Sequence, residues 1–221
     1  MQKLKVDKST MLLYVVTDRT WLGDNSLAMQ VEEAIKGGAT FIQLREKELS
    51  FHDFVKVATE IKIITDQYKI PFVINDNVEV AIAVNADGVH IGQMDEDIKI
   101  ARDKLGLSKI IGVSANSVDE AIRALENGAD YIGVGAVFHT TTKMDANTVT
   151  FKTLKEICKA VDIPVIAIGG ISKDNIRELT GSGIDGVAVI SAVFAQPDIA
   201  KSTCELLQLA KQMGGNYENN S

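Results

Sequence analysis

Five charged side chains in this sequence could together bind an anionic ligand and a metal ion. Two are the carboxylates of Asp76 and Asp95, and three are the cations of Arg45, Lys47 and Lys143. Mg²⁺ takes one or two protein carboxylates with water and phosphate oxygens, while Arg and Lys neutralise phosphate charge. The whole chain carries a net charge of -7, so only a local cluster could hold an anion. We predict a magnesium–pyrophosphate site; the alternatives are helix N-capping by the carboxylates and scattered surface cations.

A second anion site is predicted at a place where the backbone would bind. Gly169-Gly170 follows one apolar run, and Ile190-Ser191 ends the next. Glycines ahead of a helical turn let backbone N–H groups approach a phosphate closely. The pattern favours a phosphomonoester site, and the alternative is that the glycines only permit a tight turn.

The histidines and cysteines indicate less. His90 lies within an apolar run, where we expect it to orient a neighbour or fill the interior rather than act as an acid or base. Cys158 and Cys204 are far apart and have no histidine-rich neighbourhood. We therefore predict two reduced thiols and no structural zinc site.

The elements that must position these residues form a repeated unit, in which a short β-branched run precedes an amphipathic stretch. The runs are nearly continuous in apolar character, as expected of parallel strands covered on both faces, and the stretches between them predict crossover helices. Eight such units in about 200 residues most economically form an α/β fold, the (β/α)8 TIM barrel, with a doubly wound sheet as the alternative. The runs are Leu12 to Val16, Thr40 to Leu44, Pro71 to Ile74, Gly88 to Ile91, Lys109 to Val113, Tyr131 to Val134, Pro164 to Ile168 and Asp185 to Ile190.

The chain shows no linker or change of composition, so we predict one domain over residues 1–221. Residues 1–10 form a polar lead-in and residues from about 214 to 221 a frayed polar tail. The acidic balance gives no general attraction to nucleic acid or to an anionic membrane. No segment has the roughly 18 consecutive apolar residues of a membrane span, and we expect a cytoplasmic protein.

In a parallel barrel, the strands' carboxyl ends carry the active site. Polar residues follow all eight predicted strands, among them Gln43, Asn75, Ser114 and the Thr140-Thr141-Thr142-Lys143 segment. Arg45, Lys47 and Lys143 would then converge over the mouth, with Asp76 and Asp95 at the ends of adjacent strands.

These strand ends resemble the thiamine-phosphate synthase family over about residues 12 to 210. The matching motifs are YVVTD (14–18), QLREK (43–47), ND (75–76), ADGVHIGQMD (86–95), GVS (112–114), ADYIGVGAVFHTTTK (129–143), AIGGI (167–171) and GVAVISA (186–192). Eight motifs in order make the resemblance specific. It implies a (β/α)8 barrel that joins hydroxymethylpyrimidine diphosphate to a thiazole phosphate and releases pyrophosphate.

The resemblance also implies roles for particular residues. It places Mg²⁺ on Asp76 and Asp95 and catalytic roles on Arg45, Lys47, Ser114 and Lys143, with the three cations stabilising the leaving group. The pyrimidine diphosphate would be bound by Gln43, Leu44, Arg45, Glu46, Lys47, Asn75, Ser114 and Lys143, and the thiazole phosphate by Thr140, Thr141, Thr142, Gly170, Ile190 and Ser191.

Three positions depart from the family pattern: Asn77 stands for an Arg, and Ala136 and His139 each stand for a Pro. They put in doubt a cation near the diphosphate and the stiffness of the loop after the sixth strand. A related thiazole tautomerase would need an acid–base His at position 136, and a non-catalytic phosphate-binding barrel is a third hypothesis. The partners expected are the two small-molecule substrates; homo-oligomer formation is left open.

Overall fold

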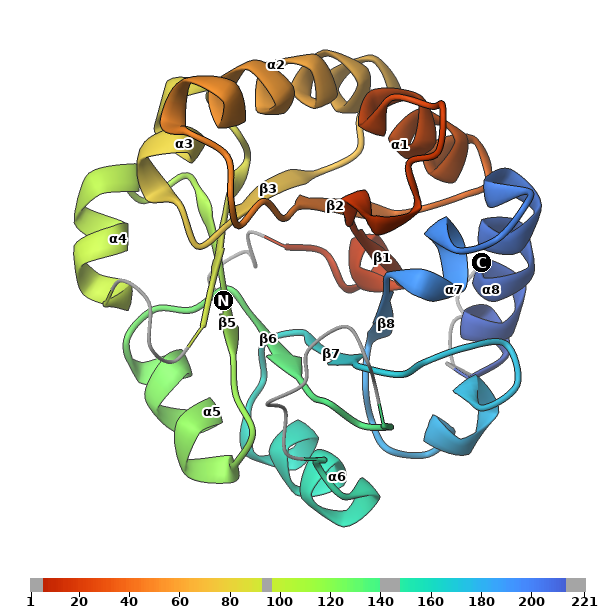
Figure 1. Ribbon diagram of the computed structural model, residues 1–221. Coiled ribbons are helices and arrows are strands. Elements are labelled where there is room, and N and C mark those ends of the chain that lie inside the picture. Colours follow the sequence, from red (N-terminus) through yellow and green to blue (C-terminus); the bar gives the residue numbers. More distant parts are fainter. Residues whose placement is uncertain (1–5, 93–96, 140–147, 214–221) are drawn as a thin grey trace.

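The computed structural model describes residues 6–92, 97–139 and 148–213, and within them eight parallel strands close into a barrel (Figure 1). Each strand pairs with the next along the chain, and the eighth pairs with the first. The predicted TIM barrel is confirmed, and the doubly wound alternative is wrong. The strands are β1 (Leu13–Val16), β2 (Phe41–Leu44), β3 (Phe72–Asn75), β4 (Gly88–Ile91), β5 (Ile110–Ser114), β6 (Tyr131–Val134), β7 (Val165–Ile168) and β8 (Gly186–Val189).

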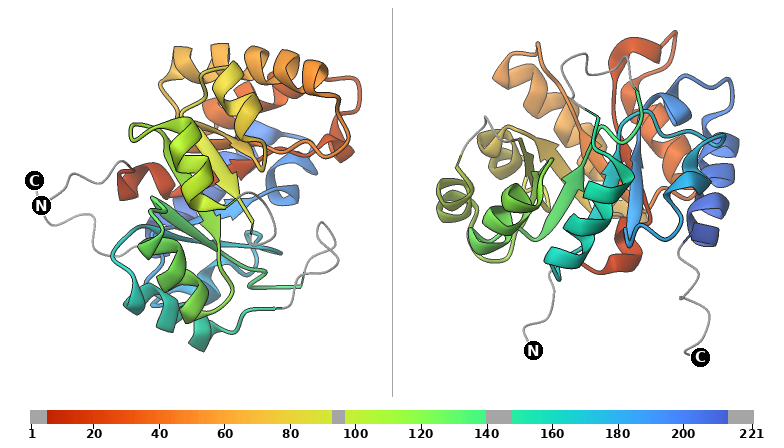
Figure 2. Two further views of the ribbon diagram at one scale, coloured as in Figure 1. Left: turned by 90° about the vertical axis from the view of Figure 1, so that its left-hand side faces the viewer. Right: turned by 90° about the horizontal axis from the view of Figure 1, so that it is seen from below.

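Helices surround the barrel, as both views in Figure 2 show. A short α-helix, α3, connects β3 to β4, whereas the β7–β8 connection, where a crossover helix is also predicted, carries only a 3-10 helix, η3. The α-helices are α1 (Leu27–Lys36), α2 (Phe51–Tyr68), α3 (Val78–Ala83), α4 (Ile98–Leu105), α5 (Val118–Glu126), α6 (Phe151–Ala160), α7 (Ser191–Phe194) and α8 (Ile199–Met213); the 3-10 helices are η1 (Lys8–Met11), η2 (Arg19–Trp21) and η3 (Ile176–Leu179).

The strands separate two apolar cores. Outward-facing strand residues and the inner faces of the helices make the larger one. Alternate residues point into the barrel and form a smaller interior cluster that includes Tyr14, Phe41, Val73 and Tyr131. Because nearly every strand residue is buried, the strands read as continuous apolar runs.

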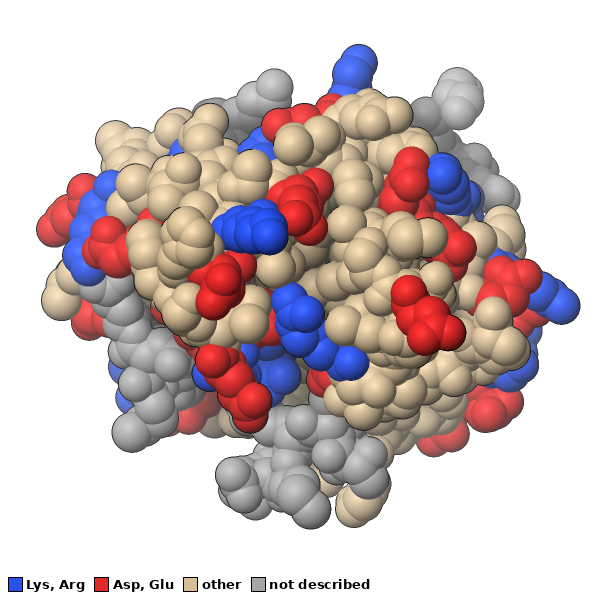
Figure 3. Space-filling model, turned by 45° about the horizontal axis from the view of Figure 1, so that its top comes forward, with Lys and Arg blue, Asp and Glu red and all other residues tan. Residues whose placement is uncertain are grey.

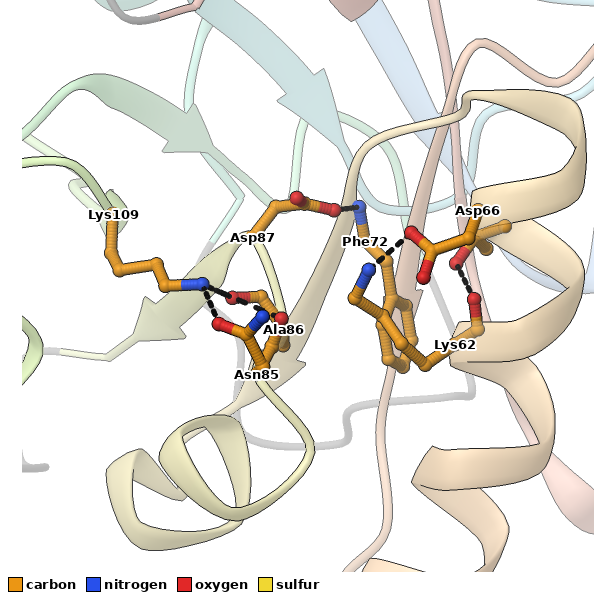
Figure 4. Close-up of polar contacts among 8 residues, drawn as sticks. Lys62, Asp66, Phe72, Asn85, Ala86, Asp87 and Lys109 are labelled. Atoms are coloured by element: carbon orange, nitrogen blue, oxygen red, sulfur yellow. Dashed lines mark hydrogen bonds and ion pairs between the residues drawn. The ribbon is translucent and has the colours of Figure 1, made fainter.

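One hydrogen-bonding arrangement, which we call a side-chain clamp, recurs four times at the amino ends of the strands. The residue before each even-numbered strand accepts, through its side chain, the N–H of the first or second residue of the preceding strand. Its own N–H donates to that residue's carbonyl. Figure 4 shows the side-chain bond of one such pair, from the Phe72 N–H to the Asp87 carboxylate. The four acceptor–donor pairs are Thr40–Leu13, Asp87–Phe72, Asp130–Ile111 and Asp185–Val165, at 2.8–2.9 Å. Each clamp thereby pairs a backbone N–H and a backbone carbonyl at the amino end of a strand, using a side chain and the N–H of the residue before the neighbouring strand.

The lead-in contributes to this end of the barrel as far as it is described. Val6 is buried, and Met11 of η1 belongs to the interior cluster. The structure describes none of residues 1–5 or of the predicted tail at 214–221. On the face shown in Figure 3, acidic and basic side chains are interspersed.

Candidate active site

The closed barrel brings the polar residues predicted at the strand ends to one side of the molecule. Gln43 lies in β2, Asn75 ends β3 and Ser114 ends β5. Ser191 begins α7 directly after β8. Parallel strands in a closed barrel share one carboxyl-terminal edge, so these residues surround a common mouth, which Figure 1 views roughly along the barrel axis.

At the β2–β3 edge, two predicted site residues are in contact. Lys47 Nζ lies 2.5 Å from Asp76 Oδ2. Asp76 has a left-handed backbone, with φ of 61°, and its N–H donates to the carbonyl of His90 on β4 at 2.8 Å. The cation and carboxylate predicted to serve one ligand therefore share one edge of the mouth.

Asp76 does not cap a helix. The N-cap of α3 is Asn77, whose Oδ1 accepts the N–H of Val80 at 2.9 Å. The capping alternative is therefore wrong for Asp76. Asn77, which stands where the family pattern carries an Arg, caps α3 instead. At α4 the cap is Asp97, whose side chain accepts the N–H of Lys99.

A second ion pair anchors the loop after β2. Arg19 Nε lies 2.7 Å from Glu46 Oε1, whose side chain is only 5% exposed. Burial raises the pKa of Glu46, and the neighbouring Arg19 opposes that shift. Thr17 Oγ1 also accepts the N–H of Arg45 at 3.0 Å. These contacts hold Arg45, Glu46 and the loop that carries them against the end of β1.

Inside the barrel, hydrogen bonds connect Gln43 to Ser114. They run through Tyr14, Tyr131 and His90, and each lies between 2.7 and 3.0 Å. His90 thus orients neighbours, as expected. The sequence reasoning missed both tyrosines, because an apolar strand gives no sign that the phenol oxygens meet across the barrel.

The glycines after β7 bring two loops close together. Gly169 and Gly170 have φ of 101° and 66°. A Cβ on Gly170 would lie 2.4 Å from the carbonyl oxygen of His139 in the loop after β6. Only glycine at position 170 therefore lets the loop after β7 lie this close to the loop after β6, as the tight-turn alternative requires. The same contact places the ends of β6 and β7 side by side.

Several predicted site residues lie outside the described part of the chain, namely Asp95, Thr140, Thr141, Thr142 and Lys143. Leu44 is described, and its side chain is fully buried in the outer core. Only the backbone of Leu44 could therefore meet a ligand.

The described residues contain no group of three or more His, Cys, Asp or Glu side chains placed to hold a metal ion. Among the helices that the structure describes, none is both long and apolar enough to cross a bilayer.

Comparison with known proteins gives a consistent result. A model of the family described as thiamine monophosphate synthase matches residues 13–193. A thiamine-phosphate synthase of Clostridium botulinum (strain Eklund 17B) is 52% identical over 204 residues, covering 92% of this chain and 94% of that protein. One from Clostridium tetani is 50% identical, covering 88% and 93%. A solved thiamine phosphate pyrophosphorylase of Pyrococcus furiosus superimposes with a TM-score of 0.86 at 40% identity, covering 93% of this chain and 98% of that one. From its fold, its strand-end residues and these similarities, we conclude that the chain belongs to the thiamine monophosphate synthase family.

Proposed function

We propose that this protein is a thiamine-phosphate synthase. It joins 4-amino-2-methyl-5-hydroxymethylpyrimidine diphosphate to 4-methyl-5-(2-phosphoethyl)thiazole and forms thiamine phosphate and pyrophosphate. The observation that carries the proposal is the 52% identity to a thiamine-phosphate synthase along almost the whole barrel. The Lys47–Asp76 edge, beside the anchored Arg45 loop, supports it independently.

In this reaction, the bond between the exocyclic CH₂ and the diphosphate oxygen breaks, and its electron pair leaves with the diphosphate. The aminopyrimidine ring delocalises the resulting cation until the lone pair of the thiazole nitrogen forms the new C–N bond. No protein nucleophile is needed. The protein positions the two substrates and stabilises the charge that grows on the leaving oxygen.

Arg45 and Lys47 are the described cations placed for the diphosphate. The contacts of Thr17 with the Arg45 backbone and of Arg19 with Glu46 fix this loop before substrate arrives. Preorganised donors cost no rearrangement in the transition state. Lys143, which lies outside the described residues, is proposed as the third cation.

The donor chemistry at this edge fits Mg²⁺. The side chain of Asp76 is 24% exposed at a strand end, and the ion pair with Lys47 engages its Oδ2 atom. One or two carboxylates suffice for Mg²⁺ when substrate phosphates and water supply the other oxygens. We propose Asp76 and Asp95 as its ligands; when bound, the ion would neutralise charge on the leaving diphosphate.

The thiazole phosphate is assigned to the other side of the mouth. Gly170, Ile190 and Ser191 lie at the ends of β7 and β8, and His139 leads into the Thr140-Thr141-Thr142 segment. Two anionic substrates then enter from opposite edges, which suits a reaction in which one must attack the other.

The test is product identification by mass spectrometry with both substrates, Mg²⁺ and purified protein. We expect thiamine phosphate, and none when the thiazole phosphate is omitted. Folded protein that yields no thiamine phosphate would contradict the proposal. Conversion of a thiazole phosphate to its isomer without the pyrimidine diphosphate would favour the tautomerase instead.

A further inference from the structure

Five polar side chains form a continuous hydrogen-bonded chain across the inside of the barrel. Gln43 Nε2 donates to the Tyr14 hydroxyl at 2.7 Å, and the Tyr14 and Tyr131 hydroxyls are 2.7 Å apart. The Tyr131 hydroxyl lies 2.9 Å from His90 Nδ1, and His90 Nε2 lies 3.0 Å from Ser114 Oγ. This interior chain begins and ends on residues proposed to bind the pyrimidine diphosphate.

The barrel is shaped to contain the interior chain. Tyr14 and Tyr131 are almost completely buried, and His90 is 9% exposed. A Cβ on Gly112 would lie 2.0 Å from Tyr131 Cζ, and one on Gly133 would lie 3.1 Å from His90 Cε1. Glycine at positions 112 and 133 therefore leaves room for the Tyr131 and His90 side chains beside them.

The orientation of the Gln43 amide, followed through by proton counting, gives the interior chain a direction. Burial raises the pKa of both tyrosines well above the usual value, so each hydroxyl keeps one proton. Tyr14 accepts from Gln43, and its own buried proton also needs an acceptor. In this direction Tyr14 therefore donates to Tyr131, which in turn donates to His90 Nδ1. In this direction His90 carries its proton on Nε2, where it donates to Ser114.

The reverse direction is also self-consistent, but it presents the opposite groups to a ligand. If the Gln43 amide turned over, Tyr14 would donate to its oxygen, and every later bond would reverse until Ser114 donated to His90. Ser114 could then no longer donate to a phosphate or ring nitrogen, and Gln43 would present its NH₂ group. The direction of the interior chain therefore decides what the site recognises.

We propose that Tyr14, Tyr131 and His90 are positioning residues that fix this direction, so that Gln43 and Ser114 select an aminopyrimidine over an oxopyrimidine. The inference rests on the proposed function. A 4-aminopyrimidine offers an amino donor beside a ring-nitrogen acceptor, which matches the carbonyl and second N–H of Gln43. A 4-oxopyrimidine offers an acceptor beside an N–H donor, which matches the overturned amide.

The first test needs no variant. Nitrogen NMR of the protein labelled at its three histidines reports which ring nitrogen of His90 carries the proton. His52→Gln and His139→Gln assign the other two signals. We expect protonation at Nε2 only; protonation at Nδ1 would show the opposite direction and overturn the inference.

The second test measures selectivity through dissociation constants for the 4-amino and 4-oxo pyrimidine diphosphates, without thiazole phosphate. We expect the wild type to prefer the amino form by about 10²-fold or more, because a mismatched ligand leaves buried polar groups unpaired. Tyr14→Phe and Tyr131→Phe should each reduce this preference about tenfold. The double variant should lose little more than either single one, since one break interrupts the whole chain.

Phe41→Leu is the matched control, because Phe41 packs 4.7 Å from the Tyr14 ring, centroid to centroid, and takes no part in the interior chain. It should lower the thermal midpoint and leave the preference intact. An unchanged preference in both Phe variants, or an equal loss in Phe41→Leu, would overturn the inference. Wild-type protein that forms no thiamine phosphate would instead contradict the proposed function, and the NMR result would still stand.

Discussion

At the scale of single residues, the candidate site depends on contacts between side chains that are far apart in the sequence, such as Lys47 with Asp76 and Arg19 with Glu46. Lys47 and Asp76 are recognisable from the sequence as candidate site residues because both follow strands. The partnership of Arg19 with Glu46 is not, because it depends on how the loops after β1 and β2 lie together. The meeting of Tyr14 and Tyr131 depends on which strand residues face inward, which the closed register sets.

Asp76→Asn should separate catalysis from stability. Asn tolerates the left-handed backbone at this position, and Asn77 already caps α3, so the thermal midpoint should change little. Loss of the carboxylate should lower kcat by about 10²-fold or more, equivalent to about 2.7 kcal/mol. Steady-state kinetics across a Mg²⁺ titration, with thermal melts, checks both expectations.

Asn77→Ala is the contrasting control beside it. Loss of the cap should cost about 1 kcal/mol, which lowers the midpoint by about 2–4 °C for a chain of this size. Its Mg²⁺ dependence should match the wild type. An Asp76→Asn protein with wild-type metal dependence would remove Asp76 from the metal site.

The two cysteines should differ in reactivity. Burial raises the pKa of the Cys158 thiol to about 12, with Asp185 adding to the shift, while Cys204 is exposed. Because the thiolate is the reactive form, Cys204 should react with a disulfide reagent near pH 8 while Cys158 is protected. We expect one fast thiol per folded chain and two after denaturation; two fast thiols in folded protein would contradict the burial of Cys158.

At the scale of elements, the sequence predicts the strands well, because burial on both faces gives each a continuous apolar run. The predicted and observed bounds differ by about one residue. The β7–β8 connection is less predictable, since the 3-10 helix η3 stands there in place of an α-helix. A short amphipathic stretch has the same sequence pattern in a 3-10 helix and in an α-helix. The side-chain clamps at the amino ends cannot be recognised from the sequence either, because Asp is also a common residue in turns that contain no such bond.

Asp87→Ala should weaken the barrel without changing its chemistry. The variant removes the acceptor of the Phe72 N–H, 2.9 Å from Asp87 Oδ2. An unsatisfied backbone group costs about 1–3 kcal/mol, or roughly 2–12 °C in midpoint for this size. Asp87→Asn keeps an acceptor oxygen and should lose less. Because the clamp lies at the end of the barrel away from the mouth, kcat/KM should stay unchanged in both; an equal loss of stability in the two would contradict the clamp.

Gly170→Ala should damage the thiazole-phosphate side of the mouth. The added Cβ would meet the His139 carbonyl oxygen at 2.4 Å and push the β6 and β7 loops apart. We expect a higher KM for the thiazole phosphate and little change in KM for the pyrimidine diphosphate. Kinetics with each substrate varied in turn gives the two constants.

Gly181→Ala is its matched control. Gly181 also has a positive φ, of 80°, but a Cβ there would meet no atom within 4 Å. Gly181→Ala should therefore lower stability, because Ala is strained at a positive φ, without displacing a loop. Both KM values should stay near wild type. If Gly170→Ala raised only the diphosphate KM, the two substrates would be assigned to the wrong edges.

At the scale of the whole molecule, the barrel separates stability from chemistry. The amino ends of the strands carry the side-chain clamps, and the carboxyl ends carry the ion pairs at Lys47 and Arg19. In a chain with a net charge of -7, the proposed binding of two anionic substrates depends on a local group of cations, of which Arg45 and Lys47 lie on the loop after β2. This arrangement follows from the closed parallel topology, which the repeated sequence unit predicts.

The central claim is that the mouth of this barrel condenses a pyrimidine diphosphate with a thiazole phosphate. The most direct measurement is the amount of pyrophosphate released per thiamine phosphate formed, with Mg²⁺ and with excess chelator. We predict one pyrophosphate for each thiamine phosphate with Mg²⁺, and a rate at least about 10²-fold lower with chelator, because charge on the leaving group is then less stabilised. Turnover that persists in chelator would contradict the magnesium site, and pyrophosphate release without thiamine phosphate would contradict the condensation itself.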